Sequence, residues 1–238
     1  FMMKEIHEQP KAVADTLGSL IKDGRIDLSG AGLDQEGMAK VRDIIVVACG
    51  SAWHVGMACQ YVIEDLTDIS VRVELASEFR YRKPRFRADT LVLVISQSGE
   101  TADTLAALRL AKENDVPTLA IVNVVGSSIA READHVIYTL AGPEIAVATT
   151  KAYSTQLIAG YCLAVQLGFV KGMIDEEAYA HYLDELLLIP QKIERLLEEK
   201  ERIQWFAAKY ANARDVFFIG RGIDYAVCLE GSLKLKEI

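Results

Sequence analysis

The sequence predicts an α/β fold, a doubly wound sheet of five parallel strands flanked by helices. Short apolar runs alternate with longer segments of helical periodicity. Strands that alternate with helices are joined by right-handed crossovers, which gives a parallel sheet covered on both faces. Small and hydroxylated residues follow several of the runs, at the edge where ligands bind in open α/β sheets. These observations define the fold class and direct the search for a site to that edge.

The five predicted strands are continuous apolar runs, as expected of strands that are buried on both faces. They lie at residues 44–48, 70–75, 90–95, 118–122 and 135–140. The helices between and around them keep the 3.6-residue spacing of apolar positions. They are expected over residues 2–22, 53–66, 101–114 and 150–169, with helical turns near residue 76 and within 125–132.

The pattern changes in the last third of the chain, where long helices replace the alternation. A Glu- and Lys-rich helix is expected over residues 175–210, interrupted near Pro190, and it is typical of a connector between domains. The apolar residues 216–219 are then predicted to form a strand, followed by a glycine turn and a helix from about Ala226. This order repeats that of residues 44–56 and indicates a duplicated α/β unit.

The repeat predicts a division into two parts. Residues 1–173 form one complete α/β domain with an N-terminal helical segment. Residues 174–238 form a helical connector and the beginning of a second, truncated unit. Because the chain starts on Phe1 and stops at Ile238 within a helical pattern, we expect it to be a fragment of a longer protein.

Composition excludes several classes of protein. Hydrophobic residues make up 51% of the chain, with 16 Gly and 5 Pro, so neither a disordered nor a collagen-like chain is expected. No apolar run approaches the ~20 residues that span a bilayer, so no membrane partner is expected. The net charge is −8 and the densest basic stretch, residues 80–87, is brief. Both features disfavour nucleic-acid binding, and the basic stretch indicates a solvated loop or a local anion-facing edge.

The cysteines and histidines give no disulfide or metal pattern. There is no CxxC pair, and no histidines stand at ligand spacing. These residues are Cys49, Cys59, Cys162, Cys228, His7, His54, His135 and His181. We therefore expect buried free thiols in a reducing cytoplasm, with no metal and no cofactor, and interpret each lone His as a core or surface residue. The N-terminal residues show no secretory signal, which also favours a cytoplasmic protein.

The most informative stretch is SQSGETADT, residues 96–104, where a predicted strand turns into a helix. The hydroxyls of Ser96, Ser98 and Thr101, with the flexible Gly99, suit an anion at a helix N-terminus and need no lysine. The stretch matches neither GxxxxGK[ST] nor GxGxxG, so a nucleotide P-loop or a dinucleotide site is not indicated. The alternative is structural: Ser98 or Thr101 caps the helix and the other polar residues fill a turn.

Two further loops favour the anion-binding interpretation. Ser51 follows the first strand and residues 147–150, VATT, precede a long helix, so hydroxylated residues recur where helices begin. Lys151 lies in the first turn of that helix, where the dipole disfavours a cation unless an anion is near. We interpret Lys151 as a solvated side chain.

A charged stripe lies near the end of the chain. Glu230, Lys234 and Glu237 fall at i, i+4 and i+7, on one face of a helix. Spacing alone favours a surface stripe of Glu and Lys pairs, worth a few tenths of a kcal/mol each. The functional alternative is a carboxylate general base beside a lysine that adjusts its charge.

Five segments taken together resemble the isomerase part of the glucosamine-6-phosphate synthase family, which is built from two sugar isomerase (SIS) domains. They are KEIHEQP at residues 4–10, ASEFRYRKP at 76–84, SQSGETADTL at 96–105, VATTKAY at 147–153 and LEGSLKLKEI at 229–238. The resemblance covers essentially the whole chain. It implies SIS domains with five parallel strands between helices, the first complete and the second truncated, and a pair that binds a hexose 6-phosphate.

The resemblance also assigns roles, residue by residue. The side chains that would hold the sugar phosphate are Ser96, Gln97, Ser98 and Thr101. Those that would line the sugar are Ser51 and the segment 147–149, with Val147 and Thr149. The catalytic residues would be Glu237, as the base that moves a proton between C1 and C2, and Lys234 and Glu230, which support it.

In that family the parent enzyme makes glucosamine 6-phosphate from fructose 6-phosphate and glutamine-derived ammonia, by imine formation and ketose-to-aldose isomerisation. The resemblance implies a homodimer and a glutaminase domain upstream of Phe1. The family's ring-opening histidine and Schiff-base lysine would lie beyond Ile238, so we expect this chain to bind the substrate without completing the synthase reaction. The family usually has Thr-Ser where this chain has Ser51 and Ala52, so rearranged sugar contacts are expected.

Two other functions remain as alternatives. One is a regulator that senses a sugar phosphate through a SIS domain without turnover, which would be expected to carry a DNA-binding or partner-binding extension. The other is a phosphosugar isomerase without amide transfer. The stripe formed by Glu230, Lys234 and Glu237 within LKLKEI favours the synthase family over the latter.

Overall fold

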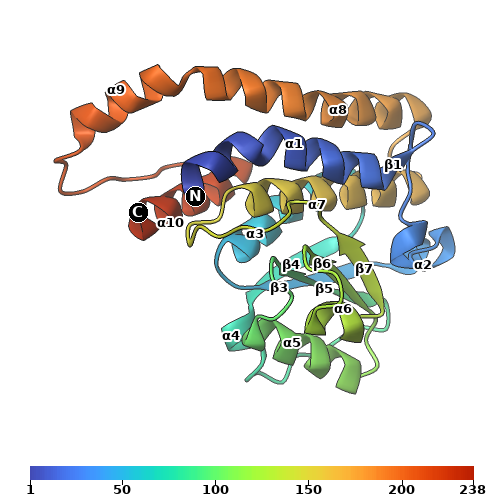
Figure 1. Cartoon of the computed structure of the whole chain (residues 1–238). Helices are drawn as coiled ribbons and strands as arrows, with labels where there is room; N and C mark the ends of the chain where they lie inside the picture. Colours follow the sequence, from blue (N-terminus) through green and yellow to red (C-terminus); the bar gives the residue numbers. More distant parts are fainter.

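The computed structural model describes all 238 residues and confirms the predicted parallel sheet (Figure 1). Five parallel strands pair in the order β4-β3-β5-β6-β7, so the chain begins near the middle of the sheet and winds outward in both directions. The strands are β3 (Asp43–Ala48), β4 (Ser70–Leu75), β5 (Thr90–Ser96), β6 (Thr118–Val122) and β7 (His135–Tyr138). All of β3, β5 and β6 is buried, which explains their uninterrupted apolar sequences.

Helices cover both faces of the sheet, and the alternation of side chains along each strand fills two cores. On β3, Ile44 and Val46 enter the larger core, whereas Ile45 and Val47 enter the smaller one. Three helices cover the larger core: α1 (Met2–Leu20), α3 (Gly50–Leu66) and α7 (Lys151–Val170). The other face carries α4 (Ala76–Phe79), α5 (Ala102–Glu113) and α6 (Ser128–Glu132). Figure 1 shows α8 (Glu176–Glu198) lying over α1 as an outer layer.

The tight approach of α3 to α7 is a feature of the larger core. A side chain at Gly160 of α7 would overlap the Cys59 sulfur of α3, so glycine is required there for the two helices to pack this closely. The helix α7 is buried over most of its length. Even so, none of the helices combines the length and the apolarity needed to cross a bilayer.

Four short elements between α1 and β3 were not predicted. They are the hairpin β1 (Ile21–Lys22) and β2 (Arg25–Ile26), the 3-10 turn η1 (Ser29–Ala31) and α2 (Gln35–Lys40). Two-residue strands are too short to show a period, although Asp23-Gly24, both with positive φ, is a known hairpin signal. The helix α2 begins at Asp34, whose side chain accepts a hydrogen bond from the Gly37 N–H.

Two predictions for the last third of the chain were wrong. The helix α8 continues through Pro190 without a break, because the buried Leu183 and Leu186 keep it packed despite one lost backbone hydrogen bond. The break comes instead at Glu199, before α9 (Lys200–Tyr210). Residues 216–219 form no strand, since no neighbouring strand offers hydrogen bonds to this segment.

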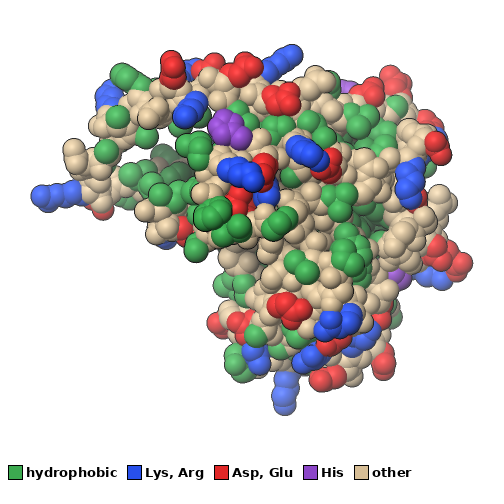
Figure 2. All heavy atoms as spheres, in the orientation of Figure 1, with side chains coloured by type: hydrophobic (Ala, Val, Ile, Leu, Met, Phe, Trp, Pro, Cys, Tyr) green, Lys and Arg blue, Asp and Glu red, His purple; other side chains and the backbone are tan.

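The C-terminal part therefore presents an apolar surface. Figure 2 shows hydrophobic side chains exposed around α9 and the segment that follows it. Phe217 is 85% exposed and Ile219 is 90% exposed. In contrast, α10 (Ile223–Glu237) packs against α3 and buries Ala226 and Glu230.

Candidate functional site

A cavity of about 320 Å³ lies at the carboxyl edge of the sheet, where β3 and β5 end. Its walls come from the turns after these strands, from the loop between β7 and α7, and from the end of α10. It is lined by Cys49, Ser51, Ala52, Ile95, Ser96, Gln97, Ser98, Thr101, Glu144, Ala146, Val147, Thr149, Gln156 and Glu237. The chain therefore brings together the seven residues predicted to bind substrate and the predicted base.

The turn from β5 to α5 forms one wall through its own hydrogen bonds. The Ser96 hydroxyl accepts from the Gly99 N–H at 3.0 Å and lies 3.0 Å from the Thr101 hydroxyl. The Ser98 hydroxyl accepts from the Glu100 N–H at 3.2 Å. The N–H groups of Thr101 and of the first residues of α5 have no partner in the chain. This wall thus presents hydroxyls and free N–H groups together, as anion sites at helix N-termini do.

The alternative interpretation, in which Ser98 or Thr101 caps α5, is only partly supported. Thr101 occupies the N-cap position of α5, but its side chain makes no capping hydrogen bond. Its hydroxyl points instead to Ser96. The first N–H groups of α5 are therefore left for a ligand or for water.

The loop between β7 and α7 forms the opposite wall. Glu144 accepts from the Thr149 hydroxyl, and from the Thr150 N–H at 2.8 Å, and so caps α7 with a negative charge. Val147 lines the cavity and is 92% exposed. The N–H groups of Val147, Ala148 and Thr149 make no hydrogen bond within the chain.

The charged stripe on α10 has two parts: Glu230 is hydrogen-bonded to residues of α3, and Glu237 lies at the cavity. Glu230 is 6% exposed and accepts from the Ser51 hydroxyl at 2.8 Å, while its other oxygen lies 2.7 Å from His54 Nδ1. Lys234 lies 3.4 Å from Glu230 and also forms an ion pair with Glu237. Glu237 lines the cavity. The stripe therefore faces α3 and the cavity, and a purely solvated stripe does not describe it.

The carboxyl of Glu230 is held in its charged form. Burial alone would raise its pKa, but the hydrogen bonds from His54 and Ser51 and the charge of Lys234 outweigh burial and hold the pKa below its ordinary value. His54 is thus a core residue, as interpreted from the sequence, and it has the further task of fixing this carboxylate.

Comparison with known proteins agrees with this geometry. The family model described as "SIS domain" matches residues 37–166, more than half of the chain. The chain belongs to the SIS domain family. The matched range includes the whole sheet, the turn at Ser96 to Thr101 and most of α7.

The relatives of this SIS domain include glutamine–fructose-6-phosphate aminotransferases (isomerizing). Those of Caldanaerobacter subterraneus subsp. tengcongensis and Clostridium tetani are each 54% identical over 239 residues, covering 100% of this chain and 39% of their own length. The solved C-terminal domain of glucosamine-fructose-6-phosphate aminotransferase from Francisella tularensis has a TM-score of 0.95 at 39% identity. The match covers 100% of this chain and 66% of that one. The chain therefore spans about two fifths of the length of these curated relatives.

One assignment in the SIS domain was wrong. Lys151 is not solvated: it is 4% exposed and donates to Glu8 of α1 at 2.7 Å. The carboxylate offsets the unfavourable position of the cation in the first turn of α7. The same ion pair lowers the pKa of Glu8, mainly through the hydrogen bond from Lys151.

Among the cavity-lining residues with polar side chains, sequence reasoning missed three: Cys49, Glu144 and Gln156. Glu144 lies three residues before the VATT segment and six before the N-cap Thr150, outside the first turn where a carboxylate in the sequence indicates capping.

The four cysteines are free thiols, as predicted, but only Cys59 and Cys162 are buried, whereas Cys49 and Cys228 are partly exposed. Burial raises the pKa of Cys59 and Cys162 to about 12, which makes both thiols poor nucleophiles.

Proposed function

We propose that this chain is the sugar-phosphate-binding isomerase part of a glutamine–fructose-6-phosphate aminotransferase. The observation that carries the proposal is the convergence of Glu237 and the seven candidate binding residues on a single cavity. The substrate is fructose 6-phosphate and the product glucosamine 6-phosphate. In the whole enzyme the nitrogen comes from glutamine.

The phosphate would sit on the turn from β5 to α5. The hydroxyls of Ser96, Ser98 and Thr101 and the free N–H groups at the start of α5 give hydrogen bonds from several directions. The partial positive charge of the helix N-terminus adds to them. Gln97 lines the same wall and would complete the contacts.

The sugar would extend from the phosphate towards Val147, Thr149 and Ser51. Ser51 is engaged with Glu230, and Ala52 offers no hydroxyl, so the free N–H groups of the 147–149 segment are the donors available for sugar oxygens. This supports the expected rearrangement of sugar contacts relative to the family.

Glu237 would act as the general base for isomerisation. After ammonia replaces the C2 carbonyl oxygen as an imine, with loss of water, Glu237 removes a proton from C1 and delivers a proton to C2, and the proton that it carries between the two steps can exchange with solvent. The C1 hydroxyl proton passes to the imine nitrogen, so that C2 carries the amine and the C1 oxygen becomes the aldehyde of the aldose. Lys234, paired with Glu237 and Glu230, would support the base by holding its carboxylate in place.

The proposal includes a division of the chain and its partners. Residues 1–173 would be the first SIS domain, and residues 174–238 a connector with the start of a second. The exposed apolar residues around Phe217 and Ile219, and the greater length of the relatives, support a further folded unit beside α10. A glutaminase domain in the same parent chain and a homodimer belong to the same proposal.

Fructose 6-phosphate and glucosamine 6-phosphate are expected to stabilise the folded chain. A ligand that binds only the folded state at 100 times its Kd adds about 2.7 kcal/mol to the free energy of unfolding. The melting temperature should therefore rise in a thermal-shift titration up to millimolar ligand, whereas unphosphorylated fructose should give no rise. No rise with either sugar phosphate would reject the proposed site.

Replacing Ser98 and Thr101 together by Ala is expected to abolish that stabilisation. Both substitutions remove hydroxyls that face the cavity, while α5 keeps its N–H groups and its packing. The measurement is the same ligand titration. Ser19→Ala in α1, which removes a hydroxyl far from the cavity, is the matched control. An unchanged thermal shift in the double variant would show that Ser98 and Thr101 do not bind the phosphate and have only a structural role in the turn.

A further inference from the structure

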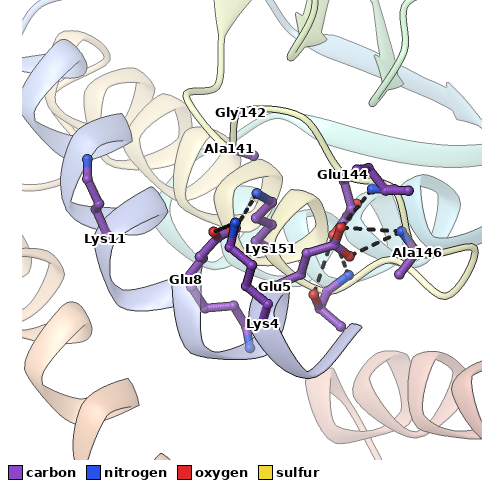
Figure 3. A network of polar contacts seen from close by, with 12 residues as sticks. Lys4, Glu5, Glu8, Lys11, Ala141, Gly142, Glu144, Ala146 and Lys151 are labelled. Carbon is purple, nitrogen blue, oxygen red and sulfur yellow. Dashed lines mark hydrogen bonds and ion pairs between the residues drawn. The ribbon is translucent and has the colours of Figure 1, made fainter. Parts of the chain in front are cut away.

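The segment KEIHEQP, residues 4–10 in the first half of α1, takes no part in the proposed chemistry. Its side chains nevertheless contact the loop between β7 and α7, which forms one wall of the cavity. Three of its polar side chains reach the loop between β7 and α7 or the first turns of α7. Figure 3 shows α1 alongside this loop, with Glu5 and Glu8 turned towards it.

Glu5 makes the contact closest to the cavity. Its side chain is buried, at 3% exposure, and accepts from the Ile145 N–H at 2.7 Å and the Ala146 N–H at 3.3 Å. No Lys, Arg or His side chain pairs with it, so two backbone N–H groups are its hydrogen-bond partners. If these two hydrogen bonds were broken, the buried charge of Glu5 would have no partner, which costs free energy. The hydrogen bonds therefore attach the loop to α1.

The rest of the segment fixes the end of the same loop. Glu8 accepts from Lys151 at 2.7 Å, and Gln9 accepts from Ser154 of α7. Figure 3 shows Lys151 reaching back from α7 to Glu8. Both pairs join the second turn of α1 to the start of α7.

The two glutamates Glu5 and Glu144 therefore bracket the sugar-lining segment. Glu5 accepts from the N–H groups of Ile145 and Ala146, and Glu144 accepts from the Thr149 hydroxyl and the Thr150 N–H. Between these anchors, the N–H groups of Val147, Ala148 and Thr149 have no partner in the chain. The free donors are thus held between two fixed points, in a segment whose Val147 and Thr149 line the cavity.

We propose that Glu5 is a positioning residue for sugar recognition: its carboxylate on α1 sets the 147–149 segment in the place where its backbone meets the sugar. The inference rests on the proposed function, since it concerns the same cavity. The phosphate would be held by the turn after β5, which Glu5 does not contact. Loss of the Glu5 carboxylate should therefore weaken the binding of the sugar and leave the binding of the phosphate unchanged.

The test is Glu5→Gln in the present chain, with dissociation constants measured by calorimetry for fructose 6-phosphate and for inorganic phosphate. The amide side chain keeps the shape but loses the charge that accepts from two N–H groups. We expect binding of the sugar phosphate to weaken about tenfold, or ~1.4 kcal/mol, while inorganic phosphate binds as in the wild type. Amide hydrogen exchange at Ile145 and Ala146 should become faster.

Asp15→Asn is the matched control, because Asp15 is a carboxylate of the same helix that pairs only with the exposed Lys11. It should leave both dissociation constants unchanged. If Glu5→Gln unfolds, Glu8→Gln at a partly exposed position serves instead, with a smaller but equally sugar-selective weakening.

The outcomes separate the two hypotheses. A wild-type chain that binds inorganic phosphate but no sugar phosphate would overturn the proposed function. A wild-type chain that binds the sugar phosphate, with an equal constant in the variant, would overturn the role of Glu5 alone. A lower melting temperature with both constants unchanged, or a parallel loss for the two ligands, would make Glu5 a purely structural residue.

Discussion

Glu237→Gln in a full-length aminotransferase that carries this chain is expected to slow isomerisation by ~10²–10⁴-fold, the usual contribution of a positioned general base. The amide is nearly isosteric but cannot accept the proton from C1. Exchange with solvent of the proton that moves between C1 and C2 should therefore stop. Phosphate-dependent binding should persist, because Glu237 belongs to α10 and not to the turn after β5 that would hold the phosphate.

Asp224→Asn is a suitable control for this variant. Asp224 is also an acidic residue of α10, but it lies in the first turn and does not line the cavity. It should leave both exchange and turnover unchanged. Continued exchange in Glu237→Gln would remove Glu237 as the base and direct attention to Glu144, the other carboxylate on the cavity wall.

The same experiment distinguishes the alternative functions. A sugar-phosphate sensor would bind ligand without any exchange, even in the unaltered full-length protein. A phosphosugar isomerase without amide transfer would exchange the proton in the absence of glutamine and ammonia and release an aldose without nitrogen. The ion pair between Lys234 and Glu237 at the cavity supports an enzyme over a sensor, because binding alone needs no paired base.

The sheet and the residues that follow its strands were predictable from sequence for one physical reason, whereas the roles of Gln97 and Glu237 came from the family resemblance. Strands buried on both faces must be apolar throughout, so β3, β5 and β6 stand out as runs. Once the strands are placed, their carboxyl ends share one edge, and the residues that follow them must meet there. Ser51 and the turn after β5 came together on that basis.

Contacts that depend on distant segments were not predictable. Lys151 and Glu8 are 143 residues apart, and nothing in either neighbourhood indicates that they meet in a partly buried pair. From the sequence alone, Glu5 is one charged residue of an amphipathic helix, and its contact with the loop between β7 and α7 could not be predicted. Residues 216–219 show the opposite case, since an apolar run predicts a strand, but a strand also requires a neighbour with which to pair.

Gly99→Ala is expected to lower the free energy of unfolding by ~2–5 kcal/mol and to abolish sugar-phosphate binding. Gly99 has φ near +65°, a left-handed conformation that costs other residues ~1–2 kcal/mol. A Cβ there would also lie 2.5 Å from the Ser127 Cβ and closer still to its hydroxyl, and overpacking typically costs ~1–3 kcal/mol. Because Ser127 is buried, the turn itself would have to move.

The chain offers a control that separates these two costs. Gly126 also has positive φ, at +73°, but an added Cβ meets nothing within 4 Å, so Gly126→Ala should lose only the conformational ~1–2 kcal/mol. Combining Gly99→Ala with Ser127→Gly removes both clashing atoms and should restore part of the stability and the ligand-induced thermal shift. Urea unfolding and the fructose 6-phosphate titration measure the two effects. If Gly99→Ala binds the ligand as well as Gly126→Ala does, the conformation of the turn after β5 is not what holds the phosphate.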